Sequence, residues 1–197
     1  MVGAALAAPV LAPVLALVLV LSGAAPLRAQ ELFAEAQESC AACHGEAAEG
    51  EVPHLGGLDA FYALVQLVAF REGDRESEVM QGMVADFSDD DLRAAADWVA
   101  GLPPPEVPAD APDADVAEAG AALVAEHRCA SCHGADLRGG RQIPYLRNQR
   151  HDYLLKALGD YRAERRIGDR AAMVEVAQAL SEPDLETLAA FLSGMGE

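Results

Sequence analysis

The chain of 197 residues is long enough for one medium domain or two small ones. Its formal net charge of −18 excludes a nucleic-acid-binding role, because too few cations are present to neutralise phosphates. Aromatic residues make up only 5% of the chain, so aromatic side chains alone cannot fill two cores.

The N-terminal segment is almost wholly apolar from Ala4 to Ala25 and is followed by Pro26-Leu27-Arg28-Ala29. A small residue after an apolar run predicts a secretory signal peptide over residues 1–29, cut after Ala29. The run is also long enough to span a bilayer, so an uncleaved membrane anchor is the alternative. Either form predicts that the remaining chain works in the periplasm.

One five-residue pattern, C-x-x-C-H, occurs twice and uses all four cysteines of the chain. It is typical of c-type haem attachment. Each thiol can add to one vinyl group of a single haem, and the following histidine can bind the iron from the same turn. We therefore predict two covalently bound haem c groups, held by Cys40, Cys43, Cys129 and Cys132, with His44 and His133 as iron ligands.

Helices are predicted around the first motif. Apolar residues at helical spacing predict a short helix over 31–39 that enters the motif, and a second, strongly apolar helix over 59–70. A third helix is expected to begin at Ser88, where a serine cap is followed by three aspartates. It should run to Ala100 and stop at Gly101.

The second half of the chain repeats the first. Residues 102–112 hold five of the eleven prolines and predict a semi-rigid linker. Beyond it, a helix over 115–127 is expected to enter the second motif, and later helix signals match those of the first half. The sequence thus predicts two all-helical domains, 30–101 and 113–197, related by internal duplication.

The repeat also selects a second ligand for each iron. Met80 and Met173 each lie eight positions before the serine that begins the last helix of their half. The competing Met83 falls on Val176, which cannot bind iron. The predicted ligand pairs are His44 with Met80 and His133 with Met173; a thioether ligand raises the reduction potential relative to two imidazoles.

Other residues at matching positions predict the surroundings of each haem. A carbonyl in the loops of Pro53 and Pro144 can accept the second N–H of the ligating histidine and fix its ring. Four arginines also match, and they could bind haem propionates, tie the two halves together or form a solvated face: Arg71, Arg75, Arg162 and Arg166.

The charge is distributed unevenly. Residues 31–101 carry 16 acids and 3 bases, whereas residues 113–197 carry 14 acids and 10 bases. The first half is therefore expected to steer toward a basic partner, with a purely solvating surface as the alternative.

Together these motifs resemble a cytochrome c4-type two-haem protein over about residues 32–195. The resemblance rests on Cys40-Ala-Ala-Cys-His-Gly, Gln66-Leu-x-x-Phe-Arg-x-Gly-x-Arg75 and Ser88-Asp-x-Asp-Leu. It implies an all-α fold of two tandem class I cytochrome c domains packed about a pseudo-twofold axis. The second half departs from the pattern at Arg147-Asn148, and its segment 160–166 is similar to the two-haem subunit of flavocytochrome c sulfide dehydrogenase.

The leading interpretation is a periplasmic electron carrier without a substrate of its own, linking a quinol-oxidising complex to a terminal oxidase or reductase. The alternative is the dihaem subunit of a redox enzyme, which would receive electrons from a flavoprotein. Membrane contact is expected only through partners or an uncleaved N-terminal segment. A methionine in both halves disfavours a peroxidase, and the histidine after each cysteine pair disfavours a four-thiolate zinc site.

Overall fold

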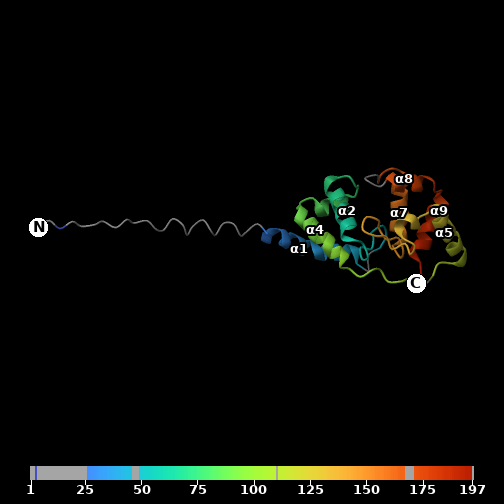
Figure 1. Cartoon of the computed structure of the whole chain (residues 1–197), viewed down its shortest axis with the longest axis horizontal. Helices are drawn as coiled ribbons and strands as arrows, with labels where there is room; N and C mark the ends of the chain where they lie inside the picture. Colours follow the sequence, from blue (N-terminus) through green and yellow to red (C-terminus); the bar gives the residue numbers. More distant parts are fainter. Residues whose placement is uncertain (1–2, 4–25, 46–48, 110, 167–170, 197) are drawn as a thin grey trace.

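The chain folds into two helical lobes, each containing one C-x-x-C-H motif (Figure 1). This computed structural model describes residue 3 and residues 26–45, 49–109, 111–166 and 171–196. The apolar run from Ala4 to Ala25, with its predicted signal or anchor role, lies outside the described residues. No helix in the described ranges combines the length and apolarity needed to cross a membrane.

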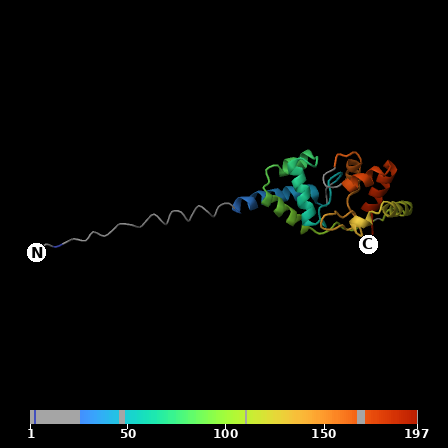
Figure 2. The same cartoon turned by 45° about the horizontal axis from the view of Figure 1, so that its top comes forward.

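The two lobes lie side by side in both views, with the blue-to-green helices on one side and the orange-to-red helices on the other (Figures 1 and 2). The helices of the first lobe are α1 (Pro26–His44), α2 (Ala60–Glu72), α3 (Glu78–Val84) and α4 (Asp89–Ala100). Those of the second lobe are α5 (Ala114–Glu126), α6 (Ala130–His133), α7 (His151–Arg162), α8 (Ala171–Gln178) and α9 (Glu182–Ser193). Within the described ranges the only β-type pairing is an isolated bridge between Gly140 and Ile143, so the all-α prediction is confirmed.

The predicted start and end of α4 are confirmed. Ser88 Oγ accepts a hydrogen bond from the Asp91 N–H at 3.2 Å, and the Asp91 carboxylate accepts the Ser88 N–H at 2.9 Å. This reciprocal pair satisfies two backbone donors at the helix start. The helix ends at Ala100, with Gly101 as its C-cap.

The helix that enters the first motif differs from the prediction. Instead of ending at Ser39, α1 continues through the motif to His44. Ala41 and Ala42 occupy the variable motif positions, and alanine has the highest helix propensity, so nothing stops the helix before Gly45. In the second lobe the corresponding path is interrupted, because Arg128 adopts a left-handed φ of 55° between α5 and α6.

In each lobe the entering helix packs against the last helix. The Phe33 ring on α1 meets the Trp98 ring on α4 edge to face, with centroids 6.3 Å apart. In the second lobe α5 crosses α9 at Gly120, where a Cβ atom would lie 2.3 Å from the Cβ of Phe191. The glycine therefore allows the two backbones to approach closely.

Gly120→Ala is expected to destabilise the second lobe by about 1–3 kcal/mol, because the added methyl overlaps Phe191. Gly159→Ala on α7 is the matched control, since nothing lies within 4 Å of its Cβ position. It should stabilise by up to ~1 kcal/mol through helix propensity. Urea unfolding of both variants checks this pair, and equal midpoints would contradict it.

Matching arginines and tyrosines join the lobes. Arg166 donates to Tyr62 Oη at 2.9 Å, and Arg75 donates to Tyr153 Oη at 3.2 Å, so each arginine reaches the tyrosine of the opposite lobe. Gln66 Oε1 accepts from Arg75 at 2.8 Å and from Arg166 at 3.0 Å. These two arginines therefore tie the lobes together.

The other two matching arginines contact acids within their own lobe. Arg71 pairs with Asp89 at 2.9 Å, and Arg162 approaches Glu182 to 3.9 Å. Of the four arginines at matching positions, two therefore connect the lobes and two pair with acids of their own lobe.

The proline-rich segment contacts both lobes. A Cβ atom at Gly56 would lie 1.7 Å from the carbonyl oxygen of Pro103, so the linker lies directly against the first lobe. At the other end, Pro112 Cδ lies 3.0 Å from the Cβ position of Gly194, just after α9. Both ends of the linker are therefore anchored by close packing at a glycine.

Candidate functional site

The two motif histidines have the same hydrogen-bond partner in each lobe. His44 Nδ1 lies 2.9 Å from the Pro53 carbonyl oxygen, and His133 Nδ1 lies 2.8 Å from that of Pro144. A carbonyl oxygen only accepts, so Nδ1 carries the proton in both rings and Nε2 keeps its lone pair. The predicted role of the two proline loops in fixing the histidine rings is confirmed.

Burial and charge keep these imidazoles neutral. Burial lowers the pKa of His44, and the charges of Arg150 and Arg75 lower it further, against the opposing hydrogen bond to Pro53. Burial also lowers the pKa of His133. A neutral imidazole with a free Nε2 is the form that binds a metal.

The four cysteines are free thiols arranged in two pairs. Cys40 and Cys43 lie on the last turn of α1, while Cys132 lies on α6 and Cys129 immediately precedes it. In each pair the first thiol is half-buried and the second is exposed, and burial raises the pKa of Cys40 and Cys129. Among the described residues no three His, Cys, Asp or Glu side chains group as a metal site, so the two pairs do not meet in a four-thiolate cluster.

The two predicted methionine ligands lie on short helices at matching places. Met80 is on α3, where it packs against the buried cluster of Phe70, Val84 and Leu92. Met173 is half-buried on α8. By contrast, Met83 is 37% exposed on α3, and Met195 packs against the second-lobe core beyond the end of α9.

Sequence reasoning missed a contact between the second lobe and the loop that contains Pro53. Gln149, only 3% exposed, accepts the His54 N–H at 2.8 Å and donates to the His54 carbonyl at 2.9 Å. The guanidinium of Arg150 donates to the carbonyls of Val52 at 2.7 Å and Gly45 at 2.6 Å. No sequence signal could have paired these residues, because they are about a hundred positions apart and their counterparts in the first lobe are Leu58 and Asp59.

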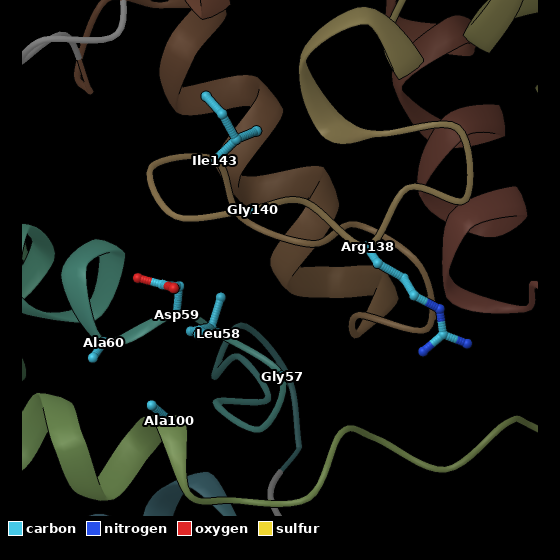
Figure 3. Close-up of a pocket in the computed structure, with 8 residues that line it drawn as sticks. All are labelled: Gly57, Leu58, Asp59, Ala60, Ala100, Arg138, Gly140 and Ile143. Carbon is cyan, nitrogen blue, oxygen red and sulfur yellow. The ribbon is translucent and has the colours of Figure 1, made fainter.

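A cleft of about 400 Å³ also lies between the lobes, lined by the start of α2, the end of α4 and the loop 138–143 (Figure 3). None of the predicted haem-binding residues lines it. In Figure 3 the side chain of Arg138 points away from Asp59, so the polar groups of this cleft do not converge on a ligand.

The donor set fits haem c in both lobes. Each lobe offers two thiols three positions apart, a histidine with Nε2 free, and a thioether on a short helix of the same lobe. Thiols, imidazole and thioether are the groups that covalent haem attachment and axial ligation require. The fold and the two donor sets define a protein of two tandem class I cytochrome c domains.

Comparisons with known proteins agree with this class. The family model "Cytochrome c" matches residues 117–196, and "Cytochrome C oxidase, cbb3-type, subunit III" matches residues 24–99. The chain is 31% identical over 172 residues to a thiosulfate dehydrogenase electron acceptor of Stutzerimonas stutzeri (strain A1501), covering 81% of this chain and 80% of that protein. It is 29% identical over 179 residues to cytochrome c4 of Azotobacter vinelandii, covering 79% and 84% of the two chains.

The fold is also that of a solved relative. Reduced recombinant cytochrome c4 from Pseudomonas stutzeri aligns with a TM-score of 0.73 at 27% identity, over 85% of this chain and 98% of that one. The chain belongs to the cytochrome c4-type family of dihaem c-type cytochromes. It binds two covalent haem c groups and functions in electron transfer.

Proposed function

We propose that the protein is a periplasmic shuttle that moves single electrons between redox proteins, with both haem irons ligated by histidine and methionine. The observation that carries this proposal is the matching arrangement of the two lobes: each motif histidine is held through Nδ1 by a prolyl carbonyl. The bound haem supplies the reversible Fe(III)/Fe(II) couple. The chain keeps each ring oriented and neutral, so a change of iron charge needs no proton transfer at these histidines.

The assignment of the attachment and ligand residues follows the repeat. Thioether bonds are assigned to the four motif cysteines, and the iron ligands to His44 with Met80 and His133 with Met173. The packing of Met80 in the first-lobe core supports its choice over the more exposed Met83. A methionine in each lobe would hold the iron together with the histidine, which would favour electron transfer over chemistry at an open iron.

The periplasmic location is proposed from the N-terminal sequence. An apolar run followed by a small residue at position 29 favours export with removal of residues 1–29. Membrane contact would then come through partner proteins.

The leading partners are a quinol-oxidising complex as the donor and a terminal oxidase or reductase as the acceptor. One relative favours a second candidate, because it is named as the electron acceptor of a thiosulfate dehydrogenase. In that role this protein would accept electrons from an enzyme that oxidises a small sulfur compound. A flavoprotein donor is the remaining form of the subunit alternative.

The first lobe offers a surface for a basic partner on the outside of α3, the helix that carries Met80. Val79 is 70% exposed and Met83 37% exposed, one turn apart on this helix. Glu76 and Glu78 precede Val79 at the start of this helix and are exposed. We call these four residues the α3 patch. An exposed apolar pair bordered by acids on one side suits a partner whose contact surface carries lysine or arginine.

The aspartates at the start of α4 are less suited to docking. Asp91 is 1% exposed and caps the helix, while Asp89 pairs with Arg71 and Asp90 with Arg93. Reversing their charge would disturb the fold of the lobe as well as its field, so the α3 patch provides the cleaner test.

The double variant Glu76→Lys, Glu78→Lys is expected to slow electron transfer to a lysine-rich monohaem cytochrome c roughly tenfold at low salt and to flatten the salt dependence. Stopped-flow mixing at several ionic strengths measures both. The matched control is Asp115→Lys, Glu118→Lys, the same charge change at exposed positions on α5 of the second lobe. Equal slowing by the two double variants would refute docking at α3.

A further inference from the structure

The loop that holds His44 is bound by the opposite lobe. Gln149 pairs with both backbone groups of His54, and Arg150 bridges the carbonyls of Gly45 and Val52. These contacts surround Pro53, whose carbonyl accepts the His44 hydrogen bond at 2.9 Å. The second lobe therefore contacts the chain on both sides of Pro53, the residue that orients the first-lobe histidine.

The polar groups of this contact are well matched. The Gln149 amide also donates to Tyr145 Oη at 3.2 Å, and its oxygen accepts the Arg150 N–H at 2.9 Å. Tyr145 in turn donates to the His54 carbonyl at 3.4 Å. A buried and fully hydrogen-bonded amide has one orientation, so the loop it contacts is fixed as well.

The internal repeat makes the contact one-sided. Leu58 stands at the position of Gln149 and has no side-chain hydrogen-bonding group, while Asp59 stands at that of Arg150 and caps α2 by accepting the Phe61 N–H. In the second lobe the Pro144 loop has backbone contacts within its own lobe, and Tyr145, the residue after Pro144, also donates to the His54 carbonyl of the first lobe at 3.4 Å. There Gly140 and Ile143 form the isolated bridge, and the Leu146 N–H donates to the Leu137 carbonyl at 2.8 Å.

We propose that Gln149 and Arg150 are positioning residues for the first haem: through the loop around Pro53 they set the hydrogen bond on His44, and with it the reduction potential of the first iron. The inference rests on the proposed ligation of that iron by His44 and Met80. A hydrogen bond accepted from Nδ1–H raises the basicity of the ligand and stabilises the ferric state. The second lobe thus adjusts the potential of the first haem through Gln149 and Arg150, and the first lobe has neither residue type at the matching positions.

The test is a spectroelectrochemical titration of the full-length dihaem protein and its variants. Gln149→Leu places in the second lobe the residue that the first lobe has, and Arg150→Lys keeps the charge but loses the fork that bridges two carbonyls. Both are expected to loosen the Pro53 loop, weaken the His44 hydrogen bond and raise the potential of the first haem. The potential of the second haem should shift less, although both substitutions lie in its lobe, because the Gly140–Ile143 bridge and the Leu146–Leu137 hydrogen bond still hold the Pro144 loop.

The first haem is identified in the same titration by Met80→Ala, which should lower its potential. Asp59→Ser is the matched control, because serine keeps the cap on α2 and the position corresponds to Arg150; it should move neither potential. If Met80→Ala shifts neither haem, the ligation proposal fails. If Met80→Ala shifts one haem, that haem is the first. The positioning role is then overturned if Gln149→Leu and Arg150→Lys leave the potential of that haem unchanged or lower it. It is also overturned if these two variants shift the potentials of both haems equally.

Discussion

Replacing Met80 with alanine is expected to abolish about half of the weak sulfur-to-iron charge-transfer absorption at the red end of the oxidised spectrum, and Met173→Ala the other half. Each thioether proposed as a ligand supplies one of the two sulfur–iron bonds. The double variant should lack the band entirely while retaining both covalently attached haems. Absorption spectra of the oxidised proteins measure the band, and their alkaline pyridine spectra measure the haem content.

The control for this pair lies three positions along the same helix. Met83 is 37% exposed, whereas Met80 packs against Phe70, Val84 and Leu92. Met83→Ala should therefore leave the band intact. A larger loss in Met83→Ala than in Met80→Ala would show that the two repeats are aligned wrongly in the first lobe.

Removal of Arg166 is expected to have the largest effect on stability. Its guanidinium donates to Tyr62, Gln66 and Tyr153 at distances of 2.9, 3.0 and 3.4 Å, and it stacks on the Tyr161 ring at 4.8 Å. Arg166→Leu removes these charge-assisted bonds at the junction of the lobes, which should cost about 2–3 kcal/mol. Chemical denaturation should show a lower midpoint and a less cooperative transition, because the lobes would unfold more independently.

The neighbouring Arg165 provides the comparison. Its side chain is 57% exposed and pairs with Asp160, which is also bound by Lys156. Because exposed ion pairs contribute little, Arg165→Leu should cost less than about 1 kcal/mol. Equal losses in the two variants would mean that the interface contacts of Arg166 do not stabilise the pairing of the lobes.

Local sequence patterns predicted the parts of the structure that depend on neighbouring residues. Ser88 and Asp91 form the expected helix start, because a capping box needs only four consecutive residues. The proline loops fix the motif histidines as expected, because loop and motif lie within about a dozen residues in each lobe. The start of α2 at Ala60 rather than Asp59 reflects the use of Asp59 as a cap.

The contacts between the lobes could not be predicted in the same way. Arg75 and Arg166 were recognised because they occupy matching positions in the two halves. The repeat does not determine whether their side chains contact a haem, the opposite lobe or solvent. The partners of Gln149 and Arg150 were hidden because the repeat places Leu58 and Asp59 opposite them. The internal repeat identifies residues that serve each lobe separately. Residues that contact the opposite lobe need not occur in both halves, so the repeat does not identify them.

The anchoring of the linker has a consequence for how charge moves within the molecule. Pro103 packs on Gly56 and Pro112 packs on Gly194, so the proline-rich linker is fixed at both ends. Together with the hydrogen bonds of Arg75 and Arg166 across the interface, this anchoring holds the lobes in one arrangement. The exchange then does not depend on tethered diffusion of the lobes or on their effective concentration. Electron tunnelling between the two haems would proceed over a constant separation, at a rate insensitive to solvent viscosity. Two successive reactions with a one-electron donor would then reduce both haems, so that one molecule carries two electrons.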